Sequence, residues 1–413
     1  MDKLKQMLRR WLGVNETPER METMKRETPR KADDAMSAQL EEFLKEGYDF
    51  RFNVLTEQAE MCRKGETTYR PVNQRVANTL CLDARDRGIN CWDKDVTRLL
   101  NSERMVDFHP FLTYMAELPV WDGIDRVTPL ARRVSSEEHW MKGFHKWMLG
   151  MAAQWSGRMG RCANAVAPLL VSTRQGMGKS TFCKLLIPES LANYYTDSFD
   201  LNSPAGCEQK LSLFGLINLD EYDKLSSTKL PLLKNLMQMT TLHYRKAHRV
   251  QYSHLPRMAS FIGTSNRMEL LNDPTGSRRY LCVELEDKLD CTPLEHKQLF
   301  AQLKAELEAG ERYWFSADEE KELMEHNRPF YAYPPTHDVF FRCFRLPEEG
   351  EEGVLLTPTE IFCKLQKKFP AAFRGSNASR MGKVLTALGV ERIRTKYGTS
   401  YRVIPVVSCP DIG

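Results

Sequence analysis

The sequence has no apolar run approaching the roughly 18 residues that a membrane-spanning helix needs. Its first residues, M-D-K-L-K-Q-M-L-R-R-W-L, lack the apolar core and cleavage site of a secretory signal. Eleven cysteines are scattered singly without a C-x-x-C pair, which argues against a structural zinc site and a disulfide framework. We therefore expect a cytoplasmic protein without membrane contact, whose cysteines are small buried hydrophobes.

A strong excess of charge of either sign is also missing, because the net charge of the 413 residues is only +4. The hydrophobic share of 42% is enough for sizeable cores, and the length suggests two or three domains. The charge is unevenly distributed, however. Between Thr359 and Ile404 we count ten Lys and Arg against two Glu, a local net charge of +8. A basic module on a nearly neutral body predicts a nucleic-acid contact at one end.

The most informative stretch is Leu169–Phe182, L-L-V-S-T-R-Q-G-M-G-K-S-T-F. An apolar run over residues 166–171 enters it, and a helix-compatible segment over residues 182–186 follows. This order of strand, glycine loop and helix is typical of a P-loop nucleotide-binding protein. The alternative is an ordinary glycine turn before a helix.

The chemistry of a polyphosphate explains these residue types. Glycines let consecutive backbone N–H groups turn inward around the phosphates of ATP. We expect Lys179 to neutralise the β- and γ-phosphates and the Ser180 hydroxyl to bind Mg²⁺. The predicted nucleotide-binding residues are Arg174, Gln175, Gly176, Met177, Gly178, Lys179, Ser180 and Thr181.

Two further apolar runs end in polar residues. Residues 214–219 lead to Asp220 and Glu221, for which we predict Mg²⁺ binding and general-base catalysis, respectively. Residues 258–263 lead to Asn266, whose amide can sense the γ-phosphate and orient water. The alternatives are a pair of acids capping a strand end and a turn-forming asparagine.

Adjacent arginines, Arg278 and Arg279, stand in the loop sequence N-D-P-T-G-S-R-R-Y. They suit an arginine finger that reaches the γ-phosphate of a neighbouring subunit. They could instead form a surface basic pair, or one of them could pair with Asp220 or Glu221 in the same subunit.

Residues 240–258 combine four Arg or Lys, three His and two Tyr without an acid. Basic residues among aromatics suit single-stranded DNA, since phosphates need charge and bases need stacking. We predict a hairpin that projects into a ring pore, or alternatively a basic surface turn or arginines that act on ATP. Its expected DNA contacts are Tyr244, Arg245, Lys246, His248 and Arg249.

The pattern of the tail predicts two helices, over residues 357–369 and 376–388, and two strands within residues 390–404. This is the order of a winged helix, which binds DNA or docks on protein. The expected DNA contacts near the second helix and on the wing are Arg374, Asn377, Arg380, Lys383 and Lys396, with Arg392, Arg394 and Arg402 also on the wing.

The expected organisation has five parts. The core opens with an aromatic helix over residues 137–157, whose spacing of three to four predicts a buried stripe. An acidic segment, P-E-E-G-E-E-G, marks the clearest boundary. The parts are a flexible leader (1–35), an N-terminal α+β domain (36–135), a P-loop core with a helical collar (136–320), a connector with the acidic linker (321–355) and a winged-helix-like domain (356–413).

The motif order resembles the virulence-associated protein E family from about Tyr48 to Leu285. The motifs are Q-G-M-G-K-S-T-F, L-D-E, the Tyr-Arg segment, F-I-G-T-S-N and D-P-T-G-S-R-R-Y, with F-N-V-L-T and F-H-P-F-L upstream. The tail resembles the C-terminal domain common in Bacteroidetes members. The resemblance implies an α/β fold with an AAA+-like core, similar to superfamily 3 helicases of phages and mobile elements. It also implies a ring oligomer, expected to be hexameric, and ATP-driven work on DNA.

By position, Lys179 and Ser180 match the Walker A residues, Asp220 and Glu221 the Walker B pair, Asn266 the sensor, and Arg278 or Arg279 the finger. Thr173 stands where the family has its first glycine, which leaves the outer turn of the loop in question. Some relatives carry a primase domain before the core, and we expect none here, so priming would come from another chain or be absent.

We therefore expect a helicase or translocase that hydrolyses ATP with Mg²⁺ between subunits and acts on single-stranded or forked DNA. The main alternative is an ATP-switched initiator, helicase loader or phage-interference regulator. A winged-helix transcription factor with an inactive ATPase is disfavoured by Glu221.

Overall fold

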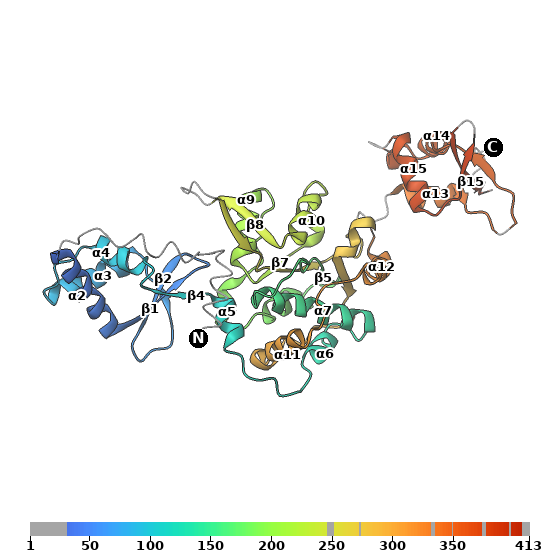
Figure 1. Cartoon of the computed structure of the whole chain (residues 1–413). Helices are drawn as coiled ribbons and strands as arrows, with labels where there is room; N and C mark the ends of the chain where they lie inside the picture. The colour runs from blue at the N-terminus through green and yellow to red at the C-terminus, as the bar shows by residue number, and fades with distance from the viewer. Residues whose placement is uncertain are drawn as a thin grey trace. The chain divides into compact units, whose positions relative to one another are not determined.

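The computed structural model describes residues 31–245, 252–271, 274–331, 335–348, 350–373, 377–395 and 398–406. The chain forms two compact units, Met1–Met268 with Asp273–Pro329 and Glu269–Asn272 with Phe330–Gly413 (Figure 1). None of the helices in the described ranges has the length and apolar character that crossing a membrane requires.

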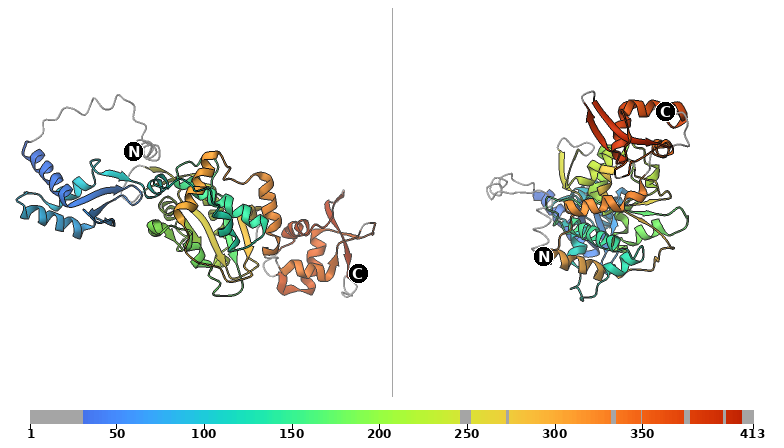
Figure 2. Two further views of the ribbon diagram at one scale, coloured as in Figure 1. Left: turned by 90° about the horizontal axis from the view of Figure 1, so that it is seen from below. Right: turned by 90° about the vertical axis from the view of Figure 1, so that its right-hand side faces the viewer.

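The first unit begins with a small sheet and three helices. Helices α2 (Lys31–Gly47), α3 (Gln74–Asp86) and α4 (Asp93–Leu100) lie beside strands β1 (Tyr48–Asn53), β2 (Gln58–Arg63), β3 (Arg70–Pro71) and β4 (Val106–Phe108) (Figure 2). The strand order is β3-β2-β1-β4, with β1 antiparallel to β2 and parallel to β4. Buried residues such as Leu40, Met61 and Leu80 join the helices to the sheet. Helix α2 takes in the last five residues of the expected leader, and residues 1–30 lie outside the described ranges.

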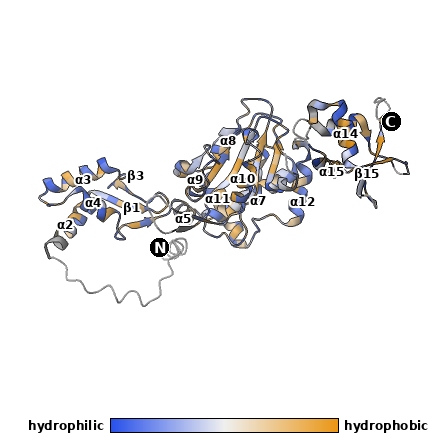
Figure 3. Cartoon of the chain, turned by 90° about the horizontal axis from the view of Figure 1, so that it is seen from above, coloured by the Kyte–Doolittle hydropathy of each residue, from blue (hydrophilic) through white to orange (hydrophobic). Residues whose placement is uncertain are grey.

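A parallel sheet of five strands forms the centre of the same unit. Its strands are β5 (Ala167–Val171), β6 (Tyr195–Thr196), β7 (Leu216–Leu219), β10 (Ser260–Ser265) and β11 (Tyr280–Glu284). They lie in the order β11-β5-β10-β7-β6, and each neighbouring pair is parallel. The sequence-based assignment to the α/β class is therefore confirmed. All residues of β5, β7 and β10 are buried, which explains the apolar residues of these strands. Figure 3 shows hydrophobic strands between the helices of this unit.

Helices cover the sheet and complete the core. Helix α7 (Glu138–Trp155) contacts β5, β10 and β11, and α11 (His296–Ala309) packs against it. The predicted aromatic stripe of α7 is confirmed, because Trp140, Phe144, Trp147 and Trp155 are all at most 1% exposed. Shorter helices of this layer are α5 (Pro110–Ala116), α6 (Val127–Arg132) and α12 (Ala317–His326).

The basic, aromatic stretch forms a hairpin next to the helices α9 (Pro204–Leu213) and α10 (Leu230–Gln238). Strands β8 (Thr241–Arg245) and β9 (Tyr252–Pro256) pair antiparallel, and the segment between them lies outside the described ranges. Arg257, which follows β9, points into the core instead of into solvent. It is 1% exposed, and its guanidinium donates to the carbonyl oxygens of Ala259 (2.7 Å), Met237 (2.5 Å) and Asn164 (3.1 Å).

The second unit has its own core, formed by α13 (Pro335–Cys343), β12 (Phe344–Arg345), β13 (Val354–Leu356), α14 (Pro358–Lys368), α15 (Ala378–Ala387), β14 (Arg392–Thr395) and β15 (Gly398–Pro405). Strand β15 pairs antiparallel with β12, β13 and β14. Phe340 and Phe344 belong to the same buried cluster as Leu365 and Val403. The acidic segment therefore lies inside this unit, between β12 and β13, where Glu351 pairs with Arg345.

Candidate nucleotide site

The glycine loop joins β5 to helix α8 (Lys179–Leu185) and has a defined shape. Gly176 and Gly178 adopt left-handed backbone angles, with φ of 74° and 85°, a conformation that glycine enters without a Cβ penalty. The loop is held from behind by the segment after β11, where the Leu289 N–H donates to the Met177 carbonyl (3.0 Å). Thr173 is not among the residues with positive φ, so a Cβ at this position causes no backbone strain.

Lys179 links the tips of two strands. Its Nζ donates to the carbonyl oxygen of Ser172 (3.0 Å), at the end of β5, and to Oδ1 of Asn266 (2.8 Å), just after β10. The side chain is largely buried, and this burial lowers the pKa of the ammonium group. The carboxylates of Asp223 and Asp220 act against this shift and raise the pKa. The loop thus presents a charged amine where a phosphate would lie.

Asp220 lies at the tip of β7, between the loop and β10. Its Oδ1 accepts hydrogen bonds from Ser180 Oγ (3.1 Å) and Thr264 Oγ1 (2.6 Å). Thr264 also accepts from the backbone N–H of Glu221 (3.2 Å), so one hydroxyl fixes both acids of the pair. No pattern in the sequence predicted a role for Thr264, although it lies two residues before Asn266.

Glu221 is one of two described non-glycine residues with a positive φ, at 52°. Its Oε1 accepts from Lys224 Nζ (2.6 Å), and both side chains are substantially exposed. A non-glycine residue in this region costs free energy and is common at functional sites. The turn directs the Glu221 side chain to the rim of the site, where water can reach it.

These residues line one cavity of about 310 Å³, formed by residues 175–181, Asp220, Glu221, Thr264 and Asn266. Predicted residues from three separate stretches of sequence thus meet at the carboxyl edge of the sheet. Arg174 is not part of the lining, and its backbone N–H donates to Ser172 Oγ (3.2 Å).

The oxygen donors of the cavity fit Mg²⁺, which prefers hydroxyl, carboxylate, water and phosphate oxygens. Ser180 and Asp220 could hold the ion, since their oxygens already lie 3.1 Å apart. In the described part of the chain, no group of three or more His, Cys, Asp or Glu could bind a metal. A Mg²⁺ ion here would need phosphate or water oxygens to complete its shell.

The two candidate finger residues do not line this cavity. Arg278 and Arg279 end the 3-10 helix η4 (Pro274–Arg279), and Arg278 Nη1 pairs with Glu320 of α12 (3.0 Å). The Asn327 side chain anchors this corner by donating to the carbonyl oxygens of Ser277 and Tyr280 (2.9 and 2.8 Å). Arg278 remains 41% exposed.

The structure describes only some of the residues that were predicted to contact DNA. Asn377 caps α15 by accepting from the Arg380 backbone N–H (3.1 Å), and the side chains of Arg380 and Lys383 are exposed on that helix. Tyr244 and Arg245 lie on β8, and nothing is described of their side chains. On the predicted wing, Arg392 and Arg394 are exposed on β14, and Arg402 lies on β15. Lys246, His248, Arg249, Arg374 and Lys396 lie outside the described ranges.

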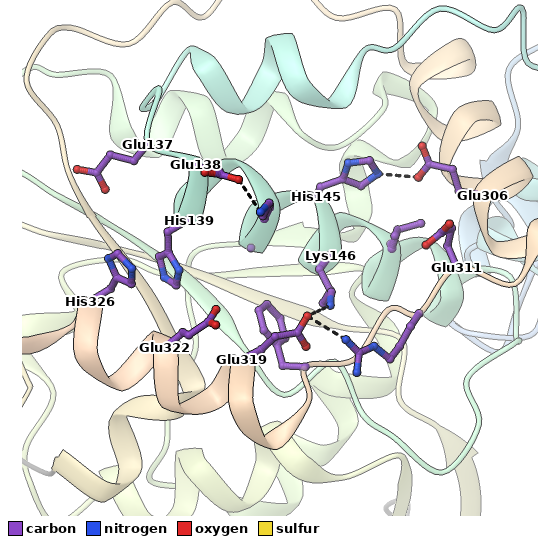
Figure 4. Close-up of a pocket in the computed structure, with 15 residues that line it drawn as sticks. Glu137, Glu138, His139, His145, Lys146, Glu306, Glu311, Glu319, Glu322 and His326 are labelled. Carbon is purple, nitrogen blue, oxygen red and sulfur yellow. Dashed lines mark hydrogen bonds and ion pairs between the residues drawn. The ribbon is translucent and has the colours of Figure 1, made fainter.

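A larger cavity of about 910 Å³ lies between α7, the end of α11 and α12, and shares no residue with the first (Figure 4). Several of its polar side chains contact one another: His145 contacts Glu306 (2.6 Å), and Glu319 pairs with both Lys146 and Arg312. The rings of His139 and His326 stack with centroids 3.7 Å apart, and burial lowers the pKa of His139 to about 4. None of the predicted site residues lies here.

A family model confirms the resemblance that the motifs indicated. The family described as virulence-associated protein E-like domain matches residues 115–332, more than half of the chain. A domain of unknown function, DUF3874, matches residues 333–403. No curated protein matches the chain.

Among solved structures, the apo structure of the NrS-1 C terminal region (305–718) is similar at a TM-score of 0.44 and 14% identity. The match covers 90% of this chain and 99% of that chain. An A form apo structure of the same region gives a TM-score of 0.42 and 13% identity, with coverage of 90% and 99%.

Proposed function

Because the chain belongs to the virulence-associated protein E-like domain family, we propose that its parallel sheet is an AAA+-like P-loop ATPase core. The protein would be an ATP-dependent DNA helicase or translocase that acts in the replication of a phage or mobile element. The observation that carries the proposal is the hydrogen bond between Lys179 and Asn266 (2.8 Å), which joins the glycine loop to a neighbouring strand tip beside Asp220.

The chemistry follows from the residues of the cavity. Lys179 would exchange its bonds to Ser172 and Asn266 for the β- and γ-phosphates of ATP, and Asn266 would then face the γ-phosphate. Ser180 and Asp220 would hold Mg²⁺, which would neutralise charge on the phosphates. Glu221 would release Lys224, accept a hydrogen bond from the attacking water and then take the proton of that water.

The position of Arg278 supports a nucleotide site that is formed by two neighbouring subunits. Because this exposed side chain does not line the cavity of its own subunit, we propose that it completes the site of a neighbour in a ring, expected to be hexameric. ATP would then lie between subunits, and a finger of this kind stabilises negative charge in the transition state.

Two parts of the chain would contact DNA. The order α13, β13, α14, α15, β14, β15 supports a winged helix that holds duplex or forked DNA through exposed Arg380 and Lys383. The β8–β9 hairpin would follow a single strand, because its stretch is basic and aromatic.

The first experiment measures ATP hydrolysis by the full chain with and without single-stranded DNA. We expect Lys179→Ala to lower kcat by about a hundredfold or more, since the lysine would contact charge that develops in the transition state. Lys184→Ala is the matched control, because Lys184 lies on the same helix but outside the cavity. Unchanged turnover in the Lys179 variant would refute the site.

Two further measurements separate the alternatives. Strand displacement from a forked DNA is expected for a helicase, whereas hydrolysis without unwinding favours an ATP-switched initiator, loader or regulator. Mixing Arg278→Ala with Lys179→Ala protein should restore part of the ATPase activity if sites are shared, because mixed interfaces then contain both residues. No gain on mixing would argue against a finger in trans.

A further inference from the structure

A third carboxylate, Asp223, lies behind the nucleotide site. It stands in the 3-10 turn η3 (Tyr222–Lys224), and its side chain is only 6% exposed. Asp223 Oδ1 accepts from Ser265 Oγ (3.1 Å) and from the backbone N–H of Asn266 (3.3 Å). Asp223 does not line the cavity, so it would not touch the nucleotide.

These bonds fix the point where the chain leaves β10. Ser265 is the last residue of the strand, and Asn266 directs its side chain to Lys179. Asp223 therefore holds the backbone from which the Asn266 amide reaches the amine. Its contact with Arg267 is weaker, since Nε lies 3.6 Å from Oδ2 and the arginine is 75% exposed.

We propose that Asp223 is a positioning residue of the nucleotide site, which orients Asn266 toward the γ-phosphate. This inference rests on the proposed ATPase function. It assigns a role to an acid two residues beyond the Walker B pair, where the motif predicts none. When Lys179 binds the γ-phosphate and releases Asn266, the hydrogen bonds that Asp223 accepts keep the Asn266 backbone in place.

The test compares Asp223→Ala, Asp223→Asn and the control Arg267→Ala in the full chain. We expect Asp223→Ala to bind ATPγS with a Kd within about threefold of wild type but to lose about tenfold or more in kcat, because a small misplacement near the reacting group is costly. The Asn variant keeps an acceptor oxygen and should recover part of kcat. The Arg267 variant should behave as wild type.

The outcomes distinguish the two proposals. If wild type does not hydrolyse ATP, the proposed function fails and the positioning role falls with it. If wild type is active and Asp223→Ala keeps its kcat, the positioning role alone is overturned. The same follows if Asp223→Asn, which keeps an acceptor oxygen, loses as much kcat as the Ala variant.

Discussion

Mild acid should destabilise the first unit through one buried histidine, His109. This side chain is fully buried, and its Nδ1 accepts from the Leu112 backbone N–H (3.3 Å) at the start of α5. Helix α5 also carries Phe111, which packs 5.0 Å from Trp155 between ring centroids. Burial lowers the pKa of His109 from 6.5 to about 3, so the folded protein holds it neutral.

The sign and size follow from linkage. Because the folded pKa lies below the unfolded one, the stability is present above pH 6.5 and is lost as the pH falls toward 3. At pH 5 the unfolded chain binds a proton that the folded chain does not. The cost is RT ln(1 + 10^1.5), about 2 kcal/mol, for an unfolded pKa near 6.5. The calculated cost changes little with the pKa of His109 in the folded protein, as long as that pKa stays below about 4.

Urea unfolding at pH 7.5 and pH 5, followed by tryptophan fluorescence, measures the effect, since the buried tryptophans share one core with Phe111. The control is His109→Asn, which can still cap α5 but does not titrate. Wild type should lose about 2 kcal/mol more than the variant between the two pH values. Other histidines, including His139, are present in both proteins and cancel. Equal losses would refute the reasoning.

Three substitutions and one control test other parts of the structure. A Cβ at Gly263 would lie 2.6 Å from Leu169 Cδ2 and 3.1 Å from a backbone oxygen, so Gly263→Ala should cost about 1–3 kcal/mol and weaken nucleotide binding in thermal melts with ATP. The control, Gly382→Ala in α15, has its first contact at 3.7 Å and should neither destabilise the chain nor change nucleotide binding, since alanine favours a helix over glycine. Arg257→Met should lower the urea unfolding free energy by about 3–5 kcal/mol, because several buried carbonyls lose a charged donor; a loss below about 1 kcal/mol would contradict this. Thr357→Ala removes the hydroxyl that accepts from the Glu360 backbone N–H (3.2 Å) in a capping box, whereas the bond from the backbone N–H of residue 357 to the Glu360 carboxylate remains. This change should cost about 1 kcal/mol, seen as faster hydrogen exchange in α14.

The sequence allowed prediction of the parts of the site that follow from strand order. Each of Lys179, Asp220 and Asn266 follows an apolar run, and parallel strands bring their carboxyl ends to one edge. Asp223 and Thr264 could not be found in this way. Their roles depend on which donor the turn places next to their oxygens, and no spacing in the sequence specifies that geometry.

The count of basic residues in a stretch was misleading, because it does not tell which of them are buried. Arg257 was one of four basic residues in the stretch expected to contact DNA, but carbonyl groups surround its guanidinium in the core. Burial lowers its pKa to about 9.

The acidic segment after β12 was expected to separate domains. Instead, it is a loop of a unit that begins near Phe330, because Phe340 and Phe344 pack in the core of that unit.

The buried position of Arg257 matters for the proposed motor. Arg257 follows β9, at the base of the hairpin, and its guanidinium donates to the carbonyl oxygen of Ala259, just before β10. At the other end of β10, Asn266 accepts a hydrogen bond from Lys179. The six residues of β10 are all buried, and the strand lies between two partners, with residues 260–263 paired to β7 and residues 263–265 paired to β5. A strand held in this way moves as a rigid element and does not stretch, since its ladder bonds would otherwise break. A change at the γ-phosphate could therefore reach the hairpin through one short strand, and Gly263, in the middle of β10, is the position where added bulk would disturb both ends.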